Sequence, residues 1–361
     1  LEEAIEAYKE AIRLGQRGIS VYERLIWLVT ITQRFDEADR YLKQLQESGS
    51  SSLDLISLES RIAAGLADMP GAPAGTRRDQ LARALKAAQL GVDVRPDDPL
   101  RHIWLGNLLF VSSQEASEED VSGLRAEAEA ELNKAVKLGP TDVRTHHALF
   151  RHYLRTEQRD RAEAVIEGSK KTEGAEEIKG VANQEGIPRH ERAFAVAQMY
   201  EQLGEPEKAE QNYREADKRA KAADIVAFRV VVLQRLAALL LKSDAEKATD
   251  VCREICRLLP ESDSAWRTLA SVLALRSVGK LDAEGEGLLR DAEEIWAKFP
   301  SGDGTSISDR RLQAALLFQR GGRQNLDKAW KLFEELVADP VNATDFDRLM
   351  LARIHGEQAK L

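Results

Sequence analysis

Apolar residues recur every three or four positions along most of the chain, which is the spacing that lines one face of an α-helix. The clearest example is residues 189–220, where two such stripes follow each other. The positions in these two stripes are Ala193, Val196, Ala197, Tyr200, Ala209, Tyr213 and Ala216. Between them Gly204 is a helix stop, and Pro206 suits the first turn of the next helix. Because one helical hairpin cannot bury its own stripe, the pattern predicts a stack of such pairs.

Similar stripes predict helices on both sides of this pair. The expected ranges are 1–16, 20–33, 53–66, 77–90, 100–111, 225–241, 245–259, 265–277, 288–299, 308–320, 326–337 and 344–355, with a further pair within 143–168. Interruptions rich in polar residues, Gly or Pro are expected at 68–76, 112–122, 169–188 and 279–287. We expect an N-terminal array at 1–168, an irregular connector or hinge at 169–188, and a C-terminal array at 189–361. The first array starts and the second ends within a repeat, so we expect a piece of a longer chain.

The residues at the packing positions resemble those of the tetratricopeptide repeat (TPR) family, which repeats a helical hairpin of about 34 residues. One unit matches the family pattern through Leu105, Gly106, Ala128, Leu132, Ala135 and Pro140. Partial matches recur in phase along nearly the whole chain. The resemblance implies an all-α fold, a right-handed α-solenoid in which antiparallel helix pairs stack into a superhelix. The first helices of the pairs would line its concave groove.

The TPR register also implies which side chains face the groove. The candidate peptide-binding residues are Asn107, Phe110, Arg144, His147, Arg151, Arg155, Phe194 and Gln198. Three arginines on one helix favour a ligand that carries carboxylates, because Arg can bind these bidentately, although a solvated basic face is the alternative. Some TPR proteins hold chaperone C-termini with a Lys/Asn/Lys/Arg clamp. That specificity is not expected here, since Ile103 stands where the clamp needs a Lys.

Charge and composition narrow the range of partners. The chain has 61 acidic and 52 basic residues and a net charge of −9, which disfavours nucleic acid because phosphate binding needs a basic face. No apolar run reaches the roughly 20 residues that span a bilayer, so membrane insertion is not expected. No signal peptide is evident, which favours the cytoplasm, but the true N-terminus is expected to be missing. Cys252 and Cys256 lie four apart on a predicted helix, and we interpret them as core residues.

Neither a metal nor another cofactor is expected. His146, His147 and His152 lack the i, i+4 spacing of a zinc pair on a helix. Residues 282–293 match the spacing of an EF-hand calcium loop. Long glutamates replace the shorter ligands at two positions, so calcium is only an open alternative.

The sequence contains no nucleophile elbow, P-loop or dinucleotide fingerprint, so we expect no enzymatic activity. We predict a non-catalytic scaffold that binds a protein or peptide partner, preferably an acidic one, in the groove of a TPR superhelix. Self-association is left open. The alternative is an accessory or oligomerisation array of a larger enzyme whose catalytic domain lies outside this chain. A helical-repeat RNA binder is a third hypothesis, and the net charge disfavours it.

Overall fold

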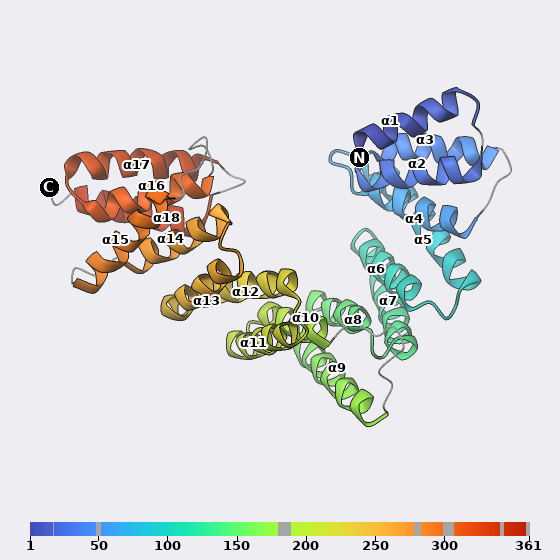
Figure 1. The fold of residues 1–361 in the computed structure, drawn as a ribbon. Helices are drawn as coiled ribbons and strands as arrows, with labels where there is room; N and C mark the ends of the chain where they lie inside the picture. The colour runs from blue at the N-terminus through green and yellow to red at the C-terminus, as the bar shows by residue number, and fades with distance from the viewer. Residues whose placement is uncertain are drawn as a thin grey trace. The chain divides into compact units, whose positions relative to one another are not determined.

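The chain folds into α-helices in a computed structural model that describes residues 1–16, 18–47, 52–179, 189–277, 283–298, 307–339 and 343–358. Within these ranges all regular structure is helical (Figure 1), which confirms the expected all-α class. The helices are α1 (Glu2–Arg13), α2 (Ile19–Ile31), α3 (Phe35–Glu47), α4 (Leu53–Ala67), α5 (Ala74–Val94), α6 (Pro99–Gln114), α7 (Glu118–Leu138), α8 (Val143–Arg155), α9 (Arg159–Lys179), α10 (Arg189–Leu203), α11 (Pro206–Ala222), α12 (Val226–Leu240), α13 (Ala245–Leu258), α14 (Asp263–Ser277), α15 (Ala283–Lys298), α16 (Ile307–Arg320), α17 (Arg323–Ala338) and α18 (Asp345–Gln358).

Neighbouring helices pack as pairs, and the pairs stack on one another. We call the even-numbered helix of each pair the A helix and the odd-numbered helix that follows it the B helix. A helices also contact each other between successive pairs, as α2 does with α4, α6 with α8, and α14 with α16. The contacts divide the chain into two compact units, 1–187 and 188–361, each of which is a stack of helix pairs.

Helix ends follow the local chemistry of the sequence. Gly204 ends α10 with a φ of +80°, a conformation that glycine adopts without strain, and Pro206 stands in the first turn of α11. Carboxylate caps start other A helices. Asp98 accepts a hydrogen bond from the Leu100 amide at the start of α6, at 3.0 Å. These positions confirm the expected stop and start signals around 204–206.

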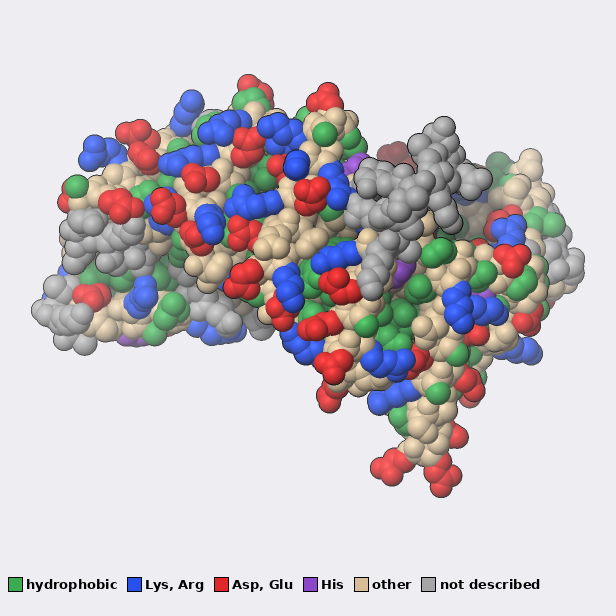
Figure 2. Space-filling model, turned by 90° about the horizontal axis from the view of Figure 1, so that it is seen from below, with side chains coloured by type: hydrophobic (Ala, Val, Ile, Leu, Met, Phe, Trp, Pro, Cys, Tyr) green, Lys and Arg blue, Asp and Glu red, His purple; other side chains and the backbone are tan. Residues whose placement is uncertain are grey.

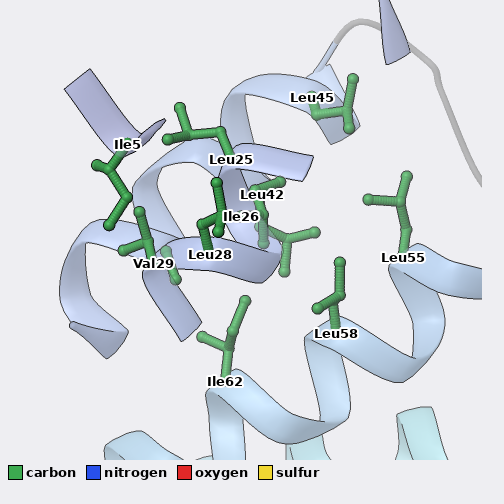
Figure 3. Packing of buried hydrophobic residues seen from close by; sticks show 11 residues of the cluster. Ile5, Leu25, Ile26, Leu28, Val29, Leu42, Leu45, Leu55, Leu58 and Ile62 are labelled. Carbon is green, nitrogen blue, oxygen red and sulfur yellow. The ribbon is translucent and has the colours of Figure 1, made fainter. Parts of the chain in front are cut away.

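The buried positions confirm the apolar stripes. In the first unit, α1, the α2–α3 pair and the A helix α4 share one core (Figure 3). Its fully buried members include Ile5, Leu25, Ile26, Val29, Leu42 and Ile62. In the second unit, Ala209, Tyr213 and Ala216 of α11 all have 0% exposure. Each pair therefore buries its stripe against its neighbours, as a repeat stack requires.

Close approach of α6 and α7 depends on Gly106. A Cβ atom at this position would lie 2.8 Å from Cγ of Leu132 and 3.1 Å from the carbonyl oxygen of Ala128. Leu132 and Ala128 are themselves buried, at 1% and 0% exposure, so neither has room to move aside. Gly106 therefore occupies the small-residue position that the TPR register gives it.

Gly106→Leu is expected to lower the free energy of unfolding by about 1–3 kcal/mol, because the added side chain overpacks the α6–α7 contact. The gain in helix propensity, about 1 kcal/mol, does not offset this. Gly123→Leu is the matched control, since a Cβ at Gly123 of α7 meets nothing within 4 Å. Urea unfolding followed by circular dichroism would measure both variants. Equal stability of the two would contradict the close-packing account.

The structure differs from the sequence expectation in the lengths of two connections. A loop was expected at 112–122, but α6 continues to Gln114 and α7 begins at Glu118. The acidic residues at 118–120 form the first turn of α7, where negative charge interacts favourably with the helix dipole. Likewise α9 extends to Lys179, into the expected connector. Lys, Glu and Ala have high helix propensity even where no apolar stripe is present. Residues 180–188 lie outside the described chain.

Candidate functional site

Helix α8 carries four of the candidate binding residues on one face. Asp142 caps it by accepting a hydrogen bond from the Arg144 amide at 2.9 Å. Its apolar side, which includes Leu149 and Phe150, is buried in the stack. Residues 144, 151 and 155 are therefore exposed on the other side, with position 147 half-buried beside them.

The three arginines of α8 have different surroundings. Arg144 is paired with its own helix cap, with Nη2 2.6 Å from Oδ2 of Asp142. The guanidinium of Arg155 lies 5.3 Å from the ring centre of Phe110, a cation–π distance. Arg151 is exposed and makes no ion pair with any residue that the structure describes. Of the three, Arg151 is thus the most available to an incoming anion.

Positive charges lie close together on this face. Burial, and then the positive charge of Arg151, lower the pKa of His147, which is therefore neutral at pH 7. The same two causes lower the pKa of Arg155. On the neighbouring helix α9, by contrast, a hydrogen bond to Glu129 raises the pKa of Arg161. Within the described chain, Arg151 and Arg155 have no such carboxylate, so a ligand carboxylate would relieve their mutual repulsion.

Two aromatic candidates are packing residues. Phe110 is only 4% exposed and belongs to a core cluster of the first unit, so a ligand cannot reach its ring. Phe194 lies on α10 in the second unit, where it packs 5.6 Å from Tyr213 and 5.5 Å from Phe228 between ring centres. Asn107 and Gln198 are half-buried on α6 and α10. The candidates therefore belong to two units, and the α8 face is the group that the structure brings together.

The structure does not support the open alternative of a calcium loop at 282–293. Residues 283–298 form the continuous helix α15, whereas an EF-hand loop wraps its oxygen ligands around the ion through a sharp turn at Gly. Glu284 and Glu293 also bind arginines instead, namely Arg276 at 3.2 Å and Arg320 at 2.7 Å. Asp282 lies outside the described residues.

No group of three or more His, Cys, Asp or Glu side chains in the described ranges is placed to hold a metal ion. Cys252 and Cys256 are buried free thiols. Burial raises their pKa to about 12 and about 11, respectively, with the neighbouring thiol also contributing at Cys252. Such thiols are inert core residues and poor nucleophiles.

A cavity of about 330 Å³ in the second unit is lined by none of the candidate residues predicted from the sequence. It lies between the A helices α14 and α16, beside the end of α12. The TPR register reaches this cavity as well. With Trp266 at position 4, positions 2, 5, 9 and 13 fall on Ser264, Arg267, Ser271 and Leu275, all of which line it. Applying the register to α14 would have found these residues from the sequence.

Two further cavities follow the A helices of the first unit. One of about 300 Å³ lies between α2 and α4, and one of about 380 Å³ is lined by α4, α5 and α6. Ser57 and Arg61 line both, so the two are neighbours along one surface. Trp27, which lines the first cavity, is 37% exposed, and the guanidinium of Arg24 lies 4.9 Å from its ring centre. A-helix surfaces in this unit thus offer two neighbouring depressions.

Charges on the molecular surface are mixed. On the face that Figure 2 shows, Lys and Arg side chains are interspersed with Asp and Glu and do not gather into one basic stripe. In the described part of the chain, none of the helices has both the length and the apolarity needed to cross a bilayer.

Comparisons with known proteins give matches of low similarity among solved structures. No family model and no curated protein matches the chain. Among solved structures, a TPR protein from Thermus thermophilus matches at 19% sequence identity and a TM-score of 0.39. The match covers 61% of this chain and 97% of that protein. A TPR protein from Parabacteroides merdae matches at 12% sequence identity and a TM-score of 0.42, over 77% of this chain and 93% of that protein. Pseudomonas aeruginosa PilF matches at 16% sequence identity and a TM-score of 0.43, over 72% of this chain and 97% of that protein. At these scores the likeness is general, and the helix-pair fold rests on the chain's own packing.

Proposed function

We propose that this chain is a non-catalytic scaffold that binds partner proteins or peptides on its A-helix surfaces. In the first unit, the proposed site is the α8 face, and its ligand is an acidic segment. The single observation that carries the proposal is the pair of exposed cations, Arg151 and Arg155, which have no carboxylate partner among the described residues. Arg is well suited to this role because its guanidinium binds carboxylates in a fixed planar geometry.

An extended ligand suits this surface better than a small ion does. Helix α6 packs against α8, and the cavities at α2, α4 and α6 continue along the A helices of the same unit. These depressions offer aromatic side chains and charges of both signs, which suits an extended peptide better than a free anion. The proposal therefore names an acidic peptide segment and not a free anion.

Arg151→Glu is expected to weaken binding of an acidic peptide by about 1–2 kcal/mol, a factor of roughly 5–30. The substitution removes an attractive charge and adds a repulsive one, yet it breaks no ion pair in the described chain. A fluorescein-labelled Gly-Glu-Glu-Glu-Glu-Gly peptide, titrated with protein and followed by fluorescence anisotropy, would measure the change. Circular dichroism would establish that the variant keeps its helices.

Lys134→Glu is the matched control, because it makes the same charge change at an exposed position of the B helix α7. We expect the control to bind like the wild type, and wild-type binding to weaken as salt rises from 50 to about 300 mM, since exposed charges are screened. Equal loss in both variants would show a general charge effect and would remove α8 as the site. Tighter binding of a uridine oligonucleotide than of the peptide would favour an RNA-binding role instead.

A further inference from the structure

The cavity between α14 and α16 differs from the α8 face in its charge balance. Two arginines line it, and each faces a carboxylate. Arg267 Nε lies 3.5 Å from Oδ1 of Asp309, which also lines the cavity. Arg311 is held by both oxygens of Asp347, at 2.6 and 2.7 Å. The positive charges are therefore balanced locally, and the cavity has no net attraction for an anion.

The cavity offers both hydrogen-bond donors and hydrogen-bond acceptors. Arg267 contacts Asp309 through its Nε atom. The two terminal Nη groups of Arg267 donate to no described residue, so they can donate to a ligand. Thr268 donates its hydroxyl hydrogen to the Ser264 carbonyl at 2.9 Å, and Ser271 donates to the Arg267 carbonyl at 3.0 Å. Their oxygens therefore remain as acceptors. A peptide amide, with one carbonyl and one N–H, matches donors and acceptors that lie side by side.

The rest of the lining is aliphatic. Val272 and Leu275 contribute from α14, Leu312 and Ala315 from α16, and Leu241 from the end of α12. At about 330 Å³, the cavity is roughly twice the ~150 Å³ cavity that admits benzene in an engineered protein interior. It is thus large enough for a branched aliphatic side chain together with its backbone. Ser264 and Thr268 at its rim are exposed, which gives a ligand access.

We propose that this cavity binds a leucine-like aliphatic residue of an uncharged peptide segment. Arg267 donates to the peptide carbonyl, the Thr268 and Ser271 oxygens accept from the peptide N–H, and the aliphatic wall receives the side chain. This site is separate from the α8 face and has the opposite preference, for a neutral ligand over an acidic one. Its binding depends little on salt, because burial of apolar surface and not charge stabilises the complex.

The test uses the full chain and fluorescein-labelled Gly-Gly-Leu-Gly-Gly, with central Asp and central Lys peptides for comparison. We expect the Leu peptide to bind at least about tenfold more tightly than either charged peptide, because only Leu gains by leaving water in the aliphatic pocket. Equal or tighter binding of the Asp or Lys peptide would overturn the proposal. Failure of the Leu peptide to bind at millimolar protein would overturn it too.

Ser271→Leu fills the cavity and is expected to weaken binding of the Leu peptide by at least about tenfold. Ser271→Ala keeps the space but loses one hydrogen-bond acceptor, so it is expected to weaken binding less than Ser271→Leu does. Ala227→Leu at an exposed position of α12 is the matched control. Thr268→Leu, at the exposed rim, replaces Ser271→Leu if the latter loses helicity. Unchanged binding by the filled variant would contradict the site. Binding of the Leu peptide does not depend on Arg151, so its failure would leave the α8 proposal unaffected. Likewise, failure of the acidic peptide to bind at α8 would leave the proposal for this cavity unaffected.

Discussion

Phe333→Ala is expected to lower the local stability of the last helix pairs by about 3–5 kcal/mol, the usual cost of removing a buried aromatic ring. Phe333 of α17 is fully buried in a cluster that includes Ala314 of α16 and Met350 and Ile354 of α18. One ring thus joins three helices, and its removal leaves a cavity that close-packed neighbours fill only in part. Native-state hydrogen exchange would measure the effect as faster exchange of amides in α16 to α18.

Leu349→Ala on α18 is the control for this prediction, because Leu349 is 51% exposed and its truncation is expected to change stability by less than about 0.5 kcal/mol. Amides of the first unit should exchange at wild-type rates in both variants, since a repeat stack transmits destabilisation mainly to its neighbours. A uniform change across the whole chain would argue against local coupling of the pairs.

Asp347→Ala is expected to cost about 3 kcal/mol, the lower end of the range for breaking a buried ion pair by removing one partner. The carboxylate of Asp347 has 0% side-chain exposure, and Arg311 keeps 24%, so water compensates the arginine only in part. Asp347 also accepts hydrogen bonds from the Thr344 amide at 2.9 Å and from its hydroxyl at 2.7 Å. The variant therefore loses both the ion pair and the start of α18, as hydrogen exchange of α18 would show.

The same carboxylate gives a pH dependence with a definite sign. Burial would raise the pKa of Asp347, but the hydrogen bonds from Arg311 and Thr344 outweigh it and hold the pKa below its ordinary value. Its stabilising contribution is thus complete above the unfolded pKa of about 3.9 and is lost as pH falls through the lower folded value. The stability difference between wild type and Asp347→Asn should be constant from pH 7 to 5 and shrink below about pH 4. A difference that grew in acid would contradict this assignment.

Helix pairs and their inward positions could be predicted from the sequence because they depend on local periodicity. Ala209, Tyr213 and Ala216 lie at the spacing of a helical face, and all three are buried. Gly204 and Pro206 mark a turn through backbone chemistry alone. The loop expected at 112–122 is shorter than predicted, because a polar sequence can be either loop or exposed helix, and the caps decide.

The candidate site was harder to predict, because the register gives the face of a helix but not the depth of a side chain or its partners. Phe110 lies on the expected helix, yet neighbouring helices cover it. Arg144 is in the expected register, but Asp142, two residues earlier, binds it. The α14 cavity is lined in part by Arg311 of α16, which Asp347 of α18 holds, and this arrangement of two later helices depends on tertiary packing.

Mapping an acidic peptide onto the chain by nuclear magnetic resonance tests the proposed function most directly. Amide shifts of the deuterated, 15N-labelled protein would be followed as Gly-Glu-Glu-Glu-Glu-Gly is added. The account predicts that the largest changes fall in α8, around Arg151 and Arg155, and in the adjoining helix α6. Arg151→Glu would reduce these changes. Changes centred on the B helices α7 and α9, or changes that Arg151→Glu leaves intact, would contradict an acidic-peptide site on the A-helix surface.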